Sequence, residues 1–532
     1  MSYDPNFKHG GFHPPQAESR SLTESMDIVG EFRYLFPEQA KNPDCLLPVD
    51  DTAAVIEALK ALGETMIEPT DTPPNDSNIP PVYTYWGQFI DHDVTASDFS
   101  RVAPADIIQD SFTPLAPDVV TANVFNRRRP VLDLDSLYGD GPDGAAAHLY
   151  NADGTHFIIG TCTNIGDEST PNPSLGLERD LPRDANGMAI IGDARNDENL
   201  LVAQFHTGML RFHNAIVDWV ADREGLTGRD LFWRANTLVR HHYQWLVVND
   251  YLETITMPGT VGKILYGEQR FYNPDSNAIF MPLEYAGAVY RFGHSQVRGT
   301  YDLNQNFGRP DPINNPNINF PASFAQMFTF TGGGGMSGLP TLPNNWIADW
   351  DRLCNHNSPF PDRFARRIDT NLAIFLNNLF KSVAEAEALM PLTAMQRSIV
   401  KHLAVRNLLR GYLLSLPTGQ CVADAVGVAR LSSAELQQGN SQAVNDALTN
   451  GGFLDRTPLW YYILKEAEIH ANGNALGEVG GRIVAETQIG LLKADSNSYL
   501  NRSWNPSMGV KFANGDPITT IYDLFRFAGT AI

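Results

Sequence analysis

The chain has 532 residues, of which 43% are apolar, and it carries a formal net charge of -22 at pH 7. This length and apolar content allow a core large enough to enclose a cofactor without oligomerisation. A surface this acidic repels nucleic acid and anionic membranes, so we expect neither as a partner. The oligomeric state stays open.

Residues 1–30 are polar and rich in Pro, Gly and Ser, and we expect a flexible N-terminal arm there, followed by one domain over residues 31–532. The arm shows no secretory signal, and no segment approaches the ~20 apolar residues of a membrane span. Cysteines are few and scattered, which predicts neither a disulfide framework nor a zinc site; they are Cys45, Cys162, Cys354 and Cys421. We therefore expect a reduced cytoplasmic setting or export without a leader.

The spacing of apolar residues predicts a mainly α fold with long irregular loops and little β structure. Residues 97–190 are irregular, with short strand-like runs at 157–159 and 188–191. Helical spacing follows at Leu201, Phe205, Met209, Phe212, Ile216 and Val220. Further helices are expected over residues 230–255, 281–298, 363–388, 392–415, 432–449, 458–471 and 477–493. Residues 300–350 form a second irregular segment, and such loops on a helical scaffold are often functional walls or lids.

The segment WGQFIDHD, residues 86–93, places an amide, two carboxylates and an imidazole within six residues. Gln88 lies about one helical turn before Asp91 and His92, so these side chains could face one cavity. An imidazole of pKa ~6.5 can take and return a proton near neutral pH, and the cluster suggests oxidative chemistry on a haem. The alternative is a helix start or turn with satisfied polar side chains.

Oxygen donors are closely spaced in RRPVLDLDSLYG, residues 128–139. Asp133 and Asp135, with the backbone carbonyl of Val131, suit a hard cation that takes roughly six to eight oxygen ligands. The alternative is an acidic turn that meets only solvent.

Three later motifs place charged or ligating side chains in helical segments. GDARNDEN, residues 192–199, brings Arg195 and Glu198 to a helix start, where capping alone could explain them. VYRFGHSQV, residues 289–297, contains His294, and LAVRNLLRGYLLSLPTGQ, residues 403–420, places Asn407 and Arg410 on one helical face. A lone helical histidine is more often structural, so the motifs matter as a set.

In this order, the motifs resemble those of the animal-type haem peroxidases. The resemblance runs from FRYLFP at residue 32 to about residue 500 and is closest to bacterial members that lack the vertebrate disulfides. It implies a b-type haem whose iron is bound by His294 on the proximal side. It also implies that Asn407 accepts a hydrogen bond from that imidazole and that Arg410 and Arg291 pair with haem propionates.

On the opposite, distal side the resemblance implies that His92 moves the proton of hydrogen peroxide. Arg195 would stabilise the negative charge that develops as the O–O bond breaks, and Gln88 would hold a water or halide. Asp91 and Glu198 match the carboxylates that form ester bonds to the haem in this family.

The resemblance also implies a calcium site. Its ligand positions correspond to Asp93, Arg129, Val131, Asp133 and Asp135. Many relatives have Thr at the position of Arg129 and Ser at that of Asp135, so this chain loses one hydroxyl and gains a carboxylate. Calcium is expected, with an altered set of ligands.

The implied activity is that of a haem peroxidase, which reduces hydrogen peroxide through a ferryl haem intermediate and oxidises iodide, bromide, thiocyanate or small phenols. Asn199 replaces the methionine that bonds to haem in the chlorinating enzyme, which predicts no sulfonium link and disfavours chloride oxidation. The alternatives are a haem-dependent fatty-acid dioxygenase and a non-catalytic haem- or calcium-binding protein. Arg291 stands where the oxygenases have a radical-forming tyrosine, three residues before His294, and Tyr290 lies four before it.

Overall fold

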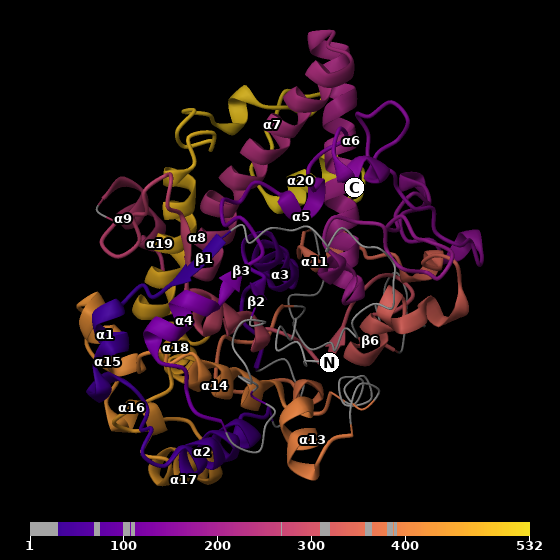
Figure 1. Ribbon diagram of the computed structural model, residues 1–532. Coiled ribbons are helices and arrows are strands. Elements are labelled where there is room, and N and C mark those ends of the chain that lie inside the picture. Colours follow the sequence, from indigo (N-terminus) through magenta and orange to yellow (C-terminus); the bar gives the residue numbers. More distant parts are fainter. Residues whose placement is uncertain are drawn as a thin grey trace.

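Helices make up most of the structure, and the predicted mainly α fold is confirmed (Figure 1). The computed structural model describes residues 30–68, 75–98, 107, 112–267, 269–308, 320–356, 364–379, 387 and 391–532. The predicted N-terminal arm lies outside these residues, apart from Gly30, which begins the first strand. Within the described ranges, no helix is long and apolar enough to cross a membrane.

Three long helices form the centre of the fold: α3 (Val82–Val94), α6 (Leu200–Glu224) and α7 (Gly228–Leu246). α3 is buried along almost its whole length and packs against α6. Asn199 caps α6 by accepting a hydrogen bond from the amide of Val202 at 3.0 Å. Gly225 ends α6 with a left-handed φ of 67°, and α7 then packs back against α6. The two helices run side by side in Figure 1.

A second group of helices surrounds the segment that contains His294. The segment is the 3₁₀ helix η9 (Val289–His294), and the helices around it are α14 (Leu403–Leu413), α18 (Leu459–Ala471) and α19 (Glu478–Ala494). η9 packs against α18, α19 and α3. The fold therefore brings the segment that ends in His294 next to the helix that contains His92.

Two small sheets tie distant parts of the chain together. The first has the order β2 (Ser97–Asp98), β3 (Phe125–Asn126), β1 (Gly30–Arg33) and β4 (Phe280–Pro282). β1 pairs in parallel with β4, with Phe32 opposite Met281, and this fixes the first described residues beside the start of the His294 segment. The second sheet pairs β5 (Thr300–Tyr301) with β6 (Ala322–Ser323).

Shorter helices fill the remainder of the described chain. They are α1 (Pro37–Lys41), α2 (Thr52–Thr65), α4 (Pro117–Asn123), α5 (Asp135–Tyr138), α8 (Leu252–Ile255), α9 (Thr260–Tyr266), α10 (Leu283–Gly287), α11 (Trp350–Leu353), α13 (Ala394–Lys401), α15 (Gly419–Val426), α16 (Ser433–Gln437), α17 (Gln442–Asn450) and α20 (Ile521–Phe527). A π-helical turn, η8 (Val247–Tyr251), joins α7 to α8. Two 3₁₀ turns are η2 (Pro43–Cys45), which contains Cys45, and η7 (Ala194–Asp197), which lies beside the site.

Some predicted helices are continuous and others are broken. The predictions for residues 230–255, 458–471 and 477–493 are confirmed to within about two residues at each end. The predicted helix 281–298 is instead β4, α10 and η9, because Ala288 has non-helical dihedrals. The prediction for 392–415 is split at His402, and that for 432–449 is split near Gly439, which has a φ of 74°.

The prediction of a helix over residues 363–388 is wrong for residues 364–373, whereas residues 374–377 form the 3₁₀ helix η13 (Ile374–Asn377) and residue 387 is helical. Leu372 forms a parallel bridge with Ile67, and Arg366 forms ion pairs with the buried carboxylates Asp76 and Glu68. These long-range contacts hold residues 364–373 in a non-helical path and override the local helical spacing. The strand-like runs at 157–159 and 188–191 form only isolated bridges.

The cysteines form one disulfide, which the sequence did not predict. Cys45 in η2 is bonded to Cys421 in α15, whereas Cys162 and Cys354 are free thiols. The two bonded residues are 376 positions apart. Two cysteines so distant in sequence give no spacing signal, so only the fold reveals that they meet.

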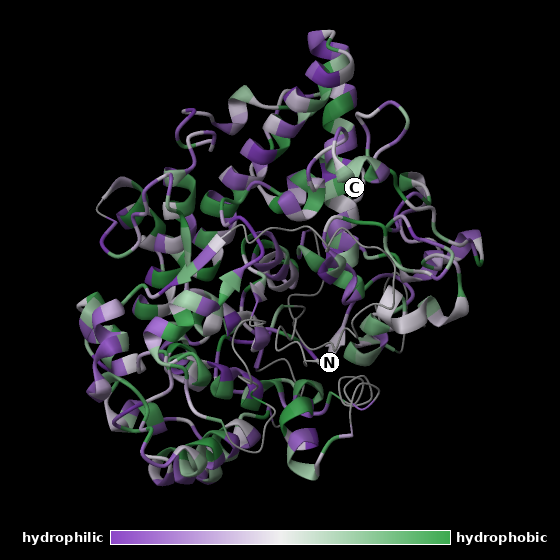
Figure 2. Cartoon of the chain, in the orientation of Figure 1, coloured by the Kyte–Doolittle hydropathy of each residue, from purple (hydrophilic) through white to green (hydrophobic). Residues whose placement is uncertain are grey.

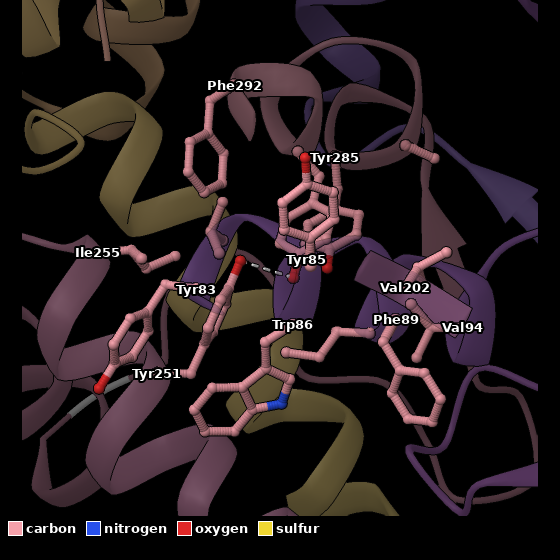
Figure 3. Packing of buried hydrophobic residues seen from close by; sticks show 14 of the residues in the cluster. Tyr83, Tyr85, Trp86, Phe89, Val94, Val202, Tyr251, Ile255, Tyr285 and Phe292 are labelled. Atoms are coloured by element: carbon pink, nitrogen blue, oxygen red, sulfur yellow. Dashed lines mark hydrogen bonds between the residues drawn. The ribbon is translucent and has the colours of Figure 1, made fainter. Parts of the chain in front are cut away.

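The core around α3 is dominated by aromatic side chains. Figure 3 shows Tyr83, Tyr85, Trp86 and Phe89 of α3 together with side chains of neighbouring elements, including Tyr251, Tyr285 and Phe292. The rings of Trp86 and Tyr251 have centroids 5.2 Å apart. Gly87 permits this packing, because a Cβ there would lie 2.5 Å from the Tyr251 hydroxyl. Both hydrophilic and hydrophobic residues occur along α6 and α7 (Figure 2), as in amphipathic helices.

Candidate active site

α3 presents its polar side chains to different surroundings. His92 and Asp93 are buried, and Gln88 and Asp91 are half-buried. Asp91 accepts a 2.8 Å hydrogen bond from the hydroxyl of Thr95. The helix thus places an imidazole, an amide and a carboxylate within one turn, while Asp93 points to a separate cluster.

His92 is held by η7, the short helix just before α6. Nδ1 of His92 lies 2.8 Å from Oδ1 of Asn196, and the backbone carbonyl of His92 accepts a 2.8 Å hydrogen bond from Nη2 of Arg195. Arg195 also donates from Nη1 to the carbonyl of Thr95 at 2.6 Å. Consecutive residues of η7 therefore fix both the side chain and the backbone of His92.

Arg195 is buried and paired with Asp193. Its Nε and Nη2 atoms donate to the Asp193 carboxylate, at 3.0 and 2.6 Å for the shortest contacts. Asp193 also accepts from the amide of Arg195 at 2.9 Å and forms an ion pair with Arg128. A guanidinium has five N–H donors, and these contacts leave one Nη1 hydrogen for another acceptor.

Gln88 is held between Glu198 and Asn199. Nδ2 of Asn199 donates to Oε1 of Gln88 at 3.0 Å, and Nε2 of Gln88 donates to Glu198 at 3.3 Å. Glu198 and Asn199 are both buried. Two of the predicted distal residues, Gln88 and Glu198, are thus in direct contact, and Asn199 is the third member of this hydrogen-bond network.

His294 is buried at the end of η9, and its Nδ1 lies 2.8 Å from Nδ2 of Asn407 in α14. If the imidazole binds iron through Nε2, Nδ1 carries the proton and the Asn407 amide must turn its oxygen toward it. Arg410 lies one helical turn after Asn407 and is also buried. The structure therefore brings three predicted proximal residues to one place.

Arg291 precedes His294 in η9, and its Nε donates to the carbonyl of Ala286 at 3.1 Å. Burial lowers the pKa of Arg291, and the carboxylate of Asp91 raises it only in part. The Asp91 carboxylate is thus the charged neighbour of this half-buried guanidinium. A cation in this position suits an additional anionic group such as a propionate.

Three carboxylates converge beside the distal segment. One oxygen each from Asp93, Asp133 and Asp135 lies within 4.8 Å of the others. The loop reaches this arrangement through left-handed backbone at Leu132 and Leu134, with φ values of 51° and 63°, which is strained for leucine. Strain of this kind persists where the surroundings impose it.

The electrostatics of this cluster fit a bound cation. Burial and the nearby Asp135 raise the pKa of Asp93 to about 7, although Asp93 accepts hydrogen bonds from the amide of Leu134 at 3.2 Å and the hydroxyl of Ser136 at 3.4 Å. Converging buried carboxylates are oxygen ligands suited to calcium. Val131 is buried in the same loop.

The side chain of Arg129, at one of the predicted ligand positions, is not directed to a cation as a ligand. Arg129 forms an ion pair with Asp133, and 61% of its side chain is exposed. A guanidinium offers no lone pair to a metal, so Arg129 competes with a cation for Asp133. Arg128 similarly lies 3.3 Å from Asp135 while pairing with Asp193.

Several residues of this site were not identified from the sequence. Asn196, Asp193 and Arg128 lie within the motifs that predicted Arg195 and the cation site, but their individual roles depend on contacts across the fold. His206 is a further such residue, and its Nδ1 lies 3.0 Å from Nδ2 of Asn196. The sequence does contain one indication of these roles, namely the run of polar residues at 192–199, directly before α6.

The chain is similar in sequence to haem peroxidases. The sequence model of the animal haem peroxidase family matches residues 113–339, a range that includes Arg195 and His294. Peroxidasin homolog pxn-2 of Caenorhabditis elegans is 27% identical over 198 residues, which cover 35% of this chain and 14% of that protein. Chorion peroxidase of Drosophila melanogaster is 28% identical over 138 residues, covering 25% and 17%. The matched parts thus span less than a fifth of these relatives.

Solved structures share the fold over almost the whole chain. Peroxidase A from Dictyostelium discoideum has a TM-score of 0.59 and 15% identity, with 100% of this chain and 98% of that chain covered. A fatty acid alpha-dioxygenase of Oryza sativa has a TM-score of 0.56 and 15% identity, covering 99% and 85%. At this identity the likeness concerns the fold alone. The family match over residues 113–339 and the peroxidasin homologues support a relationship of this part of the chain to the animal haem peroxidases.

Proposed function

We propose that this protein is a haem peroxidase that reduces hydrogen peroxide and oxidises small donors such as iodide, bromide, thiocyanate or phenols. The observation that supports this best is the pair of buried histidines on adjacent elements, each with its Nδ1 engaged by an asparagine amide. His294 would bind the iron of a b-type haem through Nε2. Arg291 and Arg410 would pair with its propionates.

Haem supplies the iron that receives peroxide and the oxidising equivalents passed to the donor. His92 would accept a proton from the incoming peroxide and return it to the outer oxygen, which leaves as water. Arg195 would hold the carbonyl of His92 and contribute a permanent positive charge near the developing negative charge. Gln88 would hold a water or halide with the second N–H of its amide, since the first is donated to Glu198.

Calcium would bind Asp93, Asp133 and Asp135, with the carbonyl of Val131 as a further ligand. Because Asp93 directly follows His92, this cation would also anchor the end of α3. Asp91 and Glu198 would be the two carboxylates able to form haem esters during turnover, and Asn199 allows no sulfonium link.

Fatty-acid dioxygenation is the second candidate, because the fold is shared with the fatty acid alpha-dioxygenase of Oryza sativa. Tyr290 also donates a 3.0 Å hydrogen bond to the hydroxyl of Tyr251 within the aromatic cluster. The peroxidase is favoured because Arg291 occupies the position of the radical-forming tyrosine. A non-catalytic haem- or calcium-binding role is a third possibility.

The test is turnover of the haem-loaded protein with hydrogen peroxide and either iodide or a phenol. Substitution His92→Leu should reduce the rate by about 10²–10⁴-fold, which is the usual contribution of a general acid–base group. His148→Leu alters an exposed histidine and should leave the rate unchanged. Oxygen uptake with linoleate in the absence of peroxide would support the dioxygenase instead. Peroxide reactivity unchanged in His92→Leu would support the non-catalytic alternative.

A further inference from the structure

Asn196 lies between two imidazoles. Its Oδ1 is 2.8 Å from Nδ1 of His92, and its Nδ2 is 3.0 Å from Nδ1 of His206. Each of the three side chains is 0% exposed. We propose that Asn196 is a positioning residue that fixes the tautomer of His92 by bridging it to His206. This inference rests on the proposed peroxidase function.

The two ends of an amide have opposite hydrogen-bonding roles. The oxygen only accepts, so His92 must carry a proton on Nδ1, and the NH₂ group only donates, so Nδ1 of His206 must hold a lone pair. With Nδ1 protonated, neutral His92 has its lone pair on Nε2, on the opposite side of the ring. This is the tautomer that can accept a proton from peroxide. The other tautomer would present an N–H group and could not.

His206 does not take up the proton that His92 accepts. Burial lowers the pKa of His206 to about 3, despite the carboxylate of Asp193, so this ring stays neutral when His92 becomes protonated. The amide of Asn196 has no acidic proton to pass on under these conditions. The proton taken by His92 is therefore retained at Nε2 and is available for return to the leaving oxygen.

The backbone around Asn196 is held as firmly as its side chain. Asp193 caps η7 by accepting from the amide of Arg195 at 2.9 Å, and the amide of Asn196 donates to the carbonyl of Asp193 at 3.0 Å. Arg195 then binds the carbonyl of His92. Charged neighbours on α3 are Asp91 and Asp93. The position of Asn196 relative to His92 is thus fixed by contacts independent of the bridge.

The test compares Asn196→Leu, Asn196→Asp and the wild type. Leucine has a similar volume but no polar atom, and it removes the constraint on His92. Aspartate, whether ionised or protonated, retains an oxygen that accepts from Nδ1 of His92. Asn344→Leu is the matched control, because Asn344 is also 0% exposed and hydrogen-bonded but lies against the loop at residues 164–170.

The direct readout is the ¹⁵N spectrum of histidine-labelled, haem-loaded protein in its diamagnetic ferrous carbonyl form. The wild type and Asn196→Asp should show protonated Nδ1 and unprotonated Nε2 at His92, assigned by comparison with His92→Leu. Asn196→Leu should show a mixture of tautomers. Its rate of reaction with peroxide should fall by about ten- to a hundredfold, Asn196→Asp should react faster than Asn196→Leu, and Asn344→Leu should retain the wild-type rate.

Two outcomes overturn the bridge. One is a protonated Nε2 at His92 in the wild type, which would mean that the Asn196 amide has the opposite orientation. The other is an unchanged tautomer and peroxide rate in Asn196→Leu. Failure of the wild type to bind haem or react with peroxide would instead overturn the proposed function, so the two failures are distinguishable.

Discussion

Asn407 and His294 lie in contact although they are 113 residues apart, with Nδ2 of the amide 2.8 Å from Nδ1 of the ring. Both side chains are buried, so the contact is shielded from water. A partner on Nδ1 sets the orientation of an imidazole and its strength as an iron ligand. The side chain at residue 407 should therefore influence the reduction potential of the haem iron.

Substitution Asn407→Asp should lower the midpoint reduction potential of the haem-loaded protein, because a carboxylate accepts more strongly from Nδ1 and makes the imidazole a better donor. Asn407→Ala should raise the potential, since the ring loses its acceptor. Spectroelectrochemical titration measures both changes. Equal potentials in all three proteins would show that Asn407 has no influence on the ligand.

Substitution Arg129→Ser should increase calcium affinity, because the Arg129 guanidinium competes with the cation for the Asp133 carboxylate. The increase should be only severalfold, since the guanidinium is largely exposed and its charge is screened by solvent. Isothermal titration calorimetry of chelator-treated protein provides the measurement. Arg127→Ser is the matched control, since Arg127 is also part-exposed but pairs with Asp98. Calcium should raise the melting temperature of the wild type and chelation should lower it. Equal affinity in both variants would argue against competition at Asp133.

His213 should make the protein sensitive to acid. It is 0% exposed, and burial lowers its pKa from 6.5 to about 4. Between these values the unfolded chain binds a proton that the folded protein does not, so the folded state loses stability as the pH falls below 6.5. The contribution of this group amounts to about 3 kcal/mol by pH 4.

Replacing His213 with Gln removes that titration. The variant should be less stable than the wild type at pH 7.5, because His213 contacts the Tyr138 hydroxyl and the Thr155 carbonyl at 2.9 and 2.8 Å. The difference in the free energy of unfolding should shrink on acidification. Urea titrations at several pH values measure it, and a difference independent of pH would contradict the assignment.

The Cys45–Cys421 disulfide should stabilise the folded chain by restricting the unfolded one. The double variant Cys45→Ser/Cys421→Ser should lose about 2–5 kcal/mol of unfolding free energy. Reductant should lower the stability of the wild type to that of the variant and leave the variant unaffected. A wild type insensitive to reductant under unfolding conditions would mean that the bond does not form.

The sequence predicted those parts of the fold in which local and long-range preferences agree. Residues 477–493 have helical spacing and pack inside the molecule as α19. Residues 364–373 also looked helical, but the ion pairs of Arg366 and the bridge at Leu372 determine their path. Such contacts join residues roughly 290–305 positions apart, so they cannot be predicted from a local sequence pattern.

The site shows the same division. Motifs singled out His92, Arg195 and His294 because each stands in a distinctive local context. The bridge from His92 through Asn196 to His206 was not foreseen, because an asparagine in a polar segment has many possible partners. The ion pair between Arg129 and Asp133 was not predicted for a different reason. The resemblance indicates that residue 129 lies near the cation site, but it does not indicate which neighbour the arginine side chain contacts.

The most direct test of the account is a haem titration followed at the Soret band, comparing the wild type with His294→Ala and with His470→Ala, which alters an exposed histidine. The account predicts saturation at one haem per chain for the wild type and His470→Ala, with a band that shifts on adding peroxide. His294→Ala should lose tight binding and the shift. Undiminished haem binding with an unchanged spectrum in His294→Ala, or no haem uptake by the wild type, would contradict it.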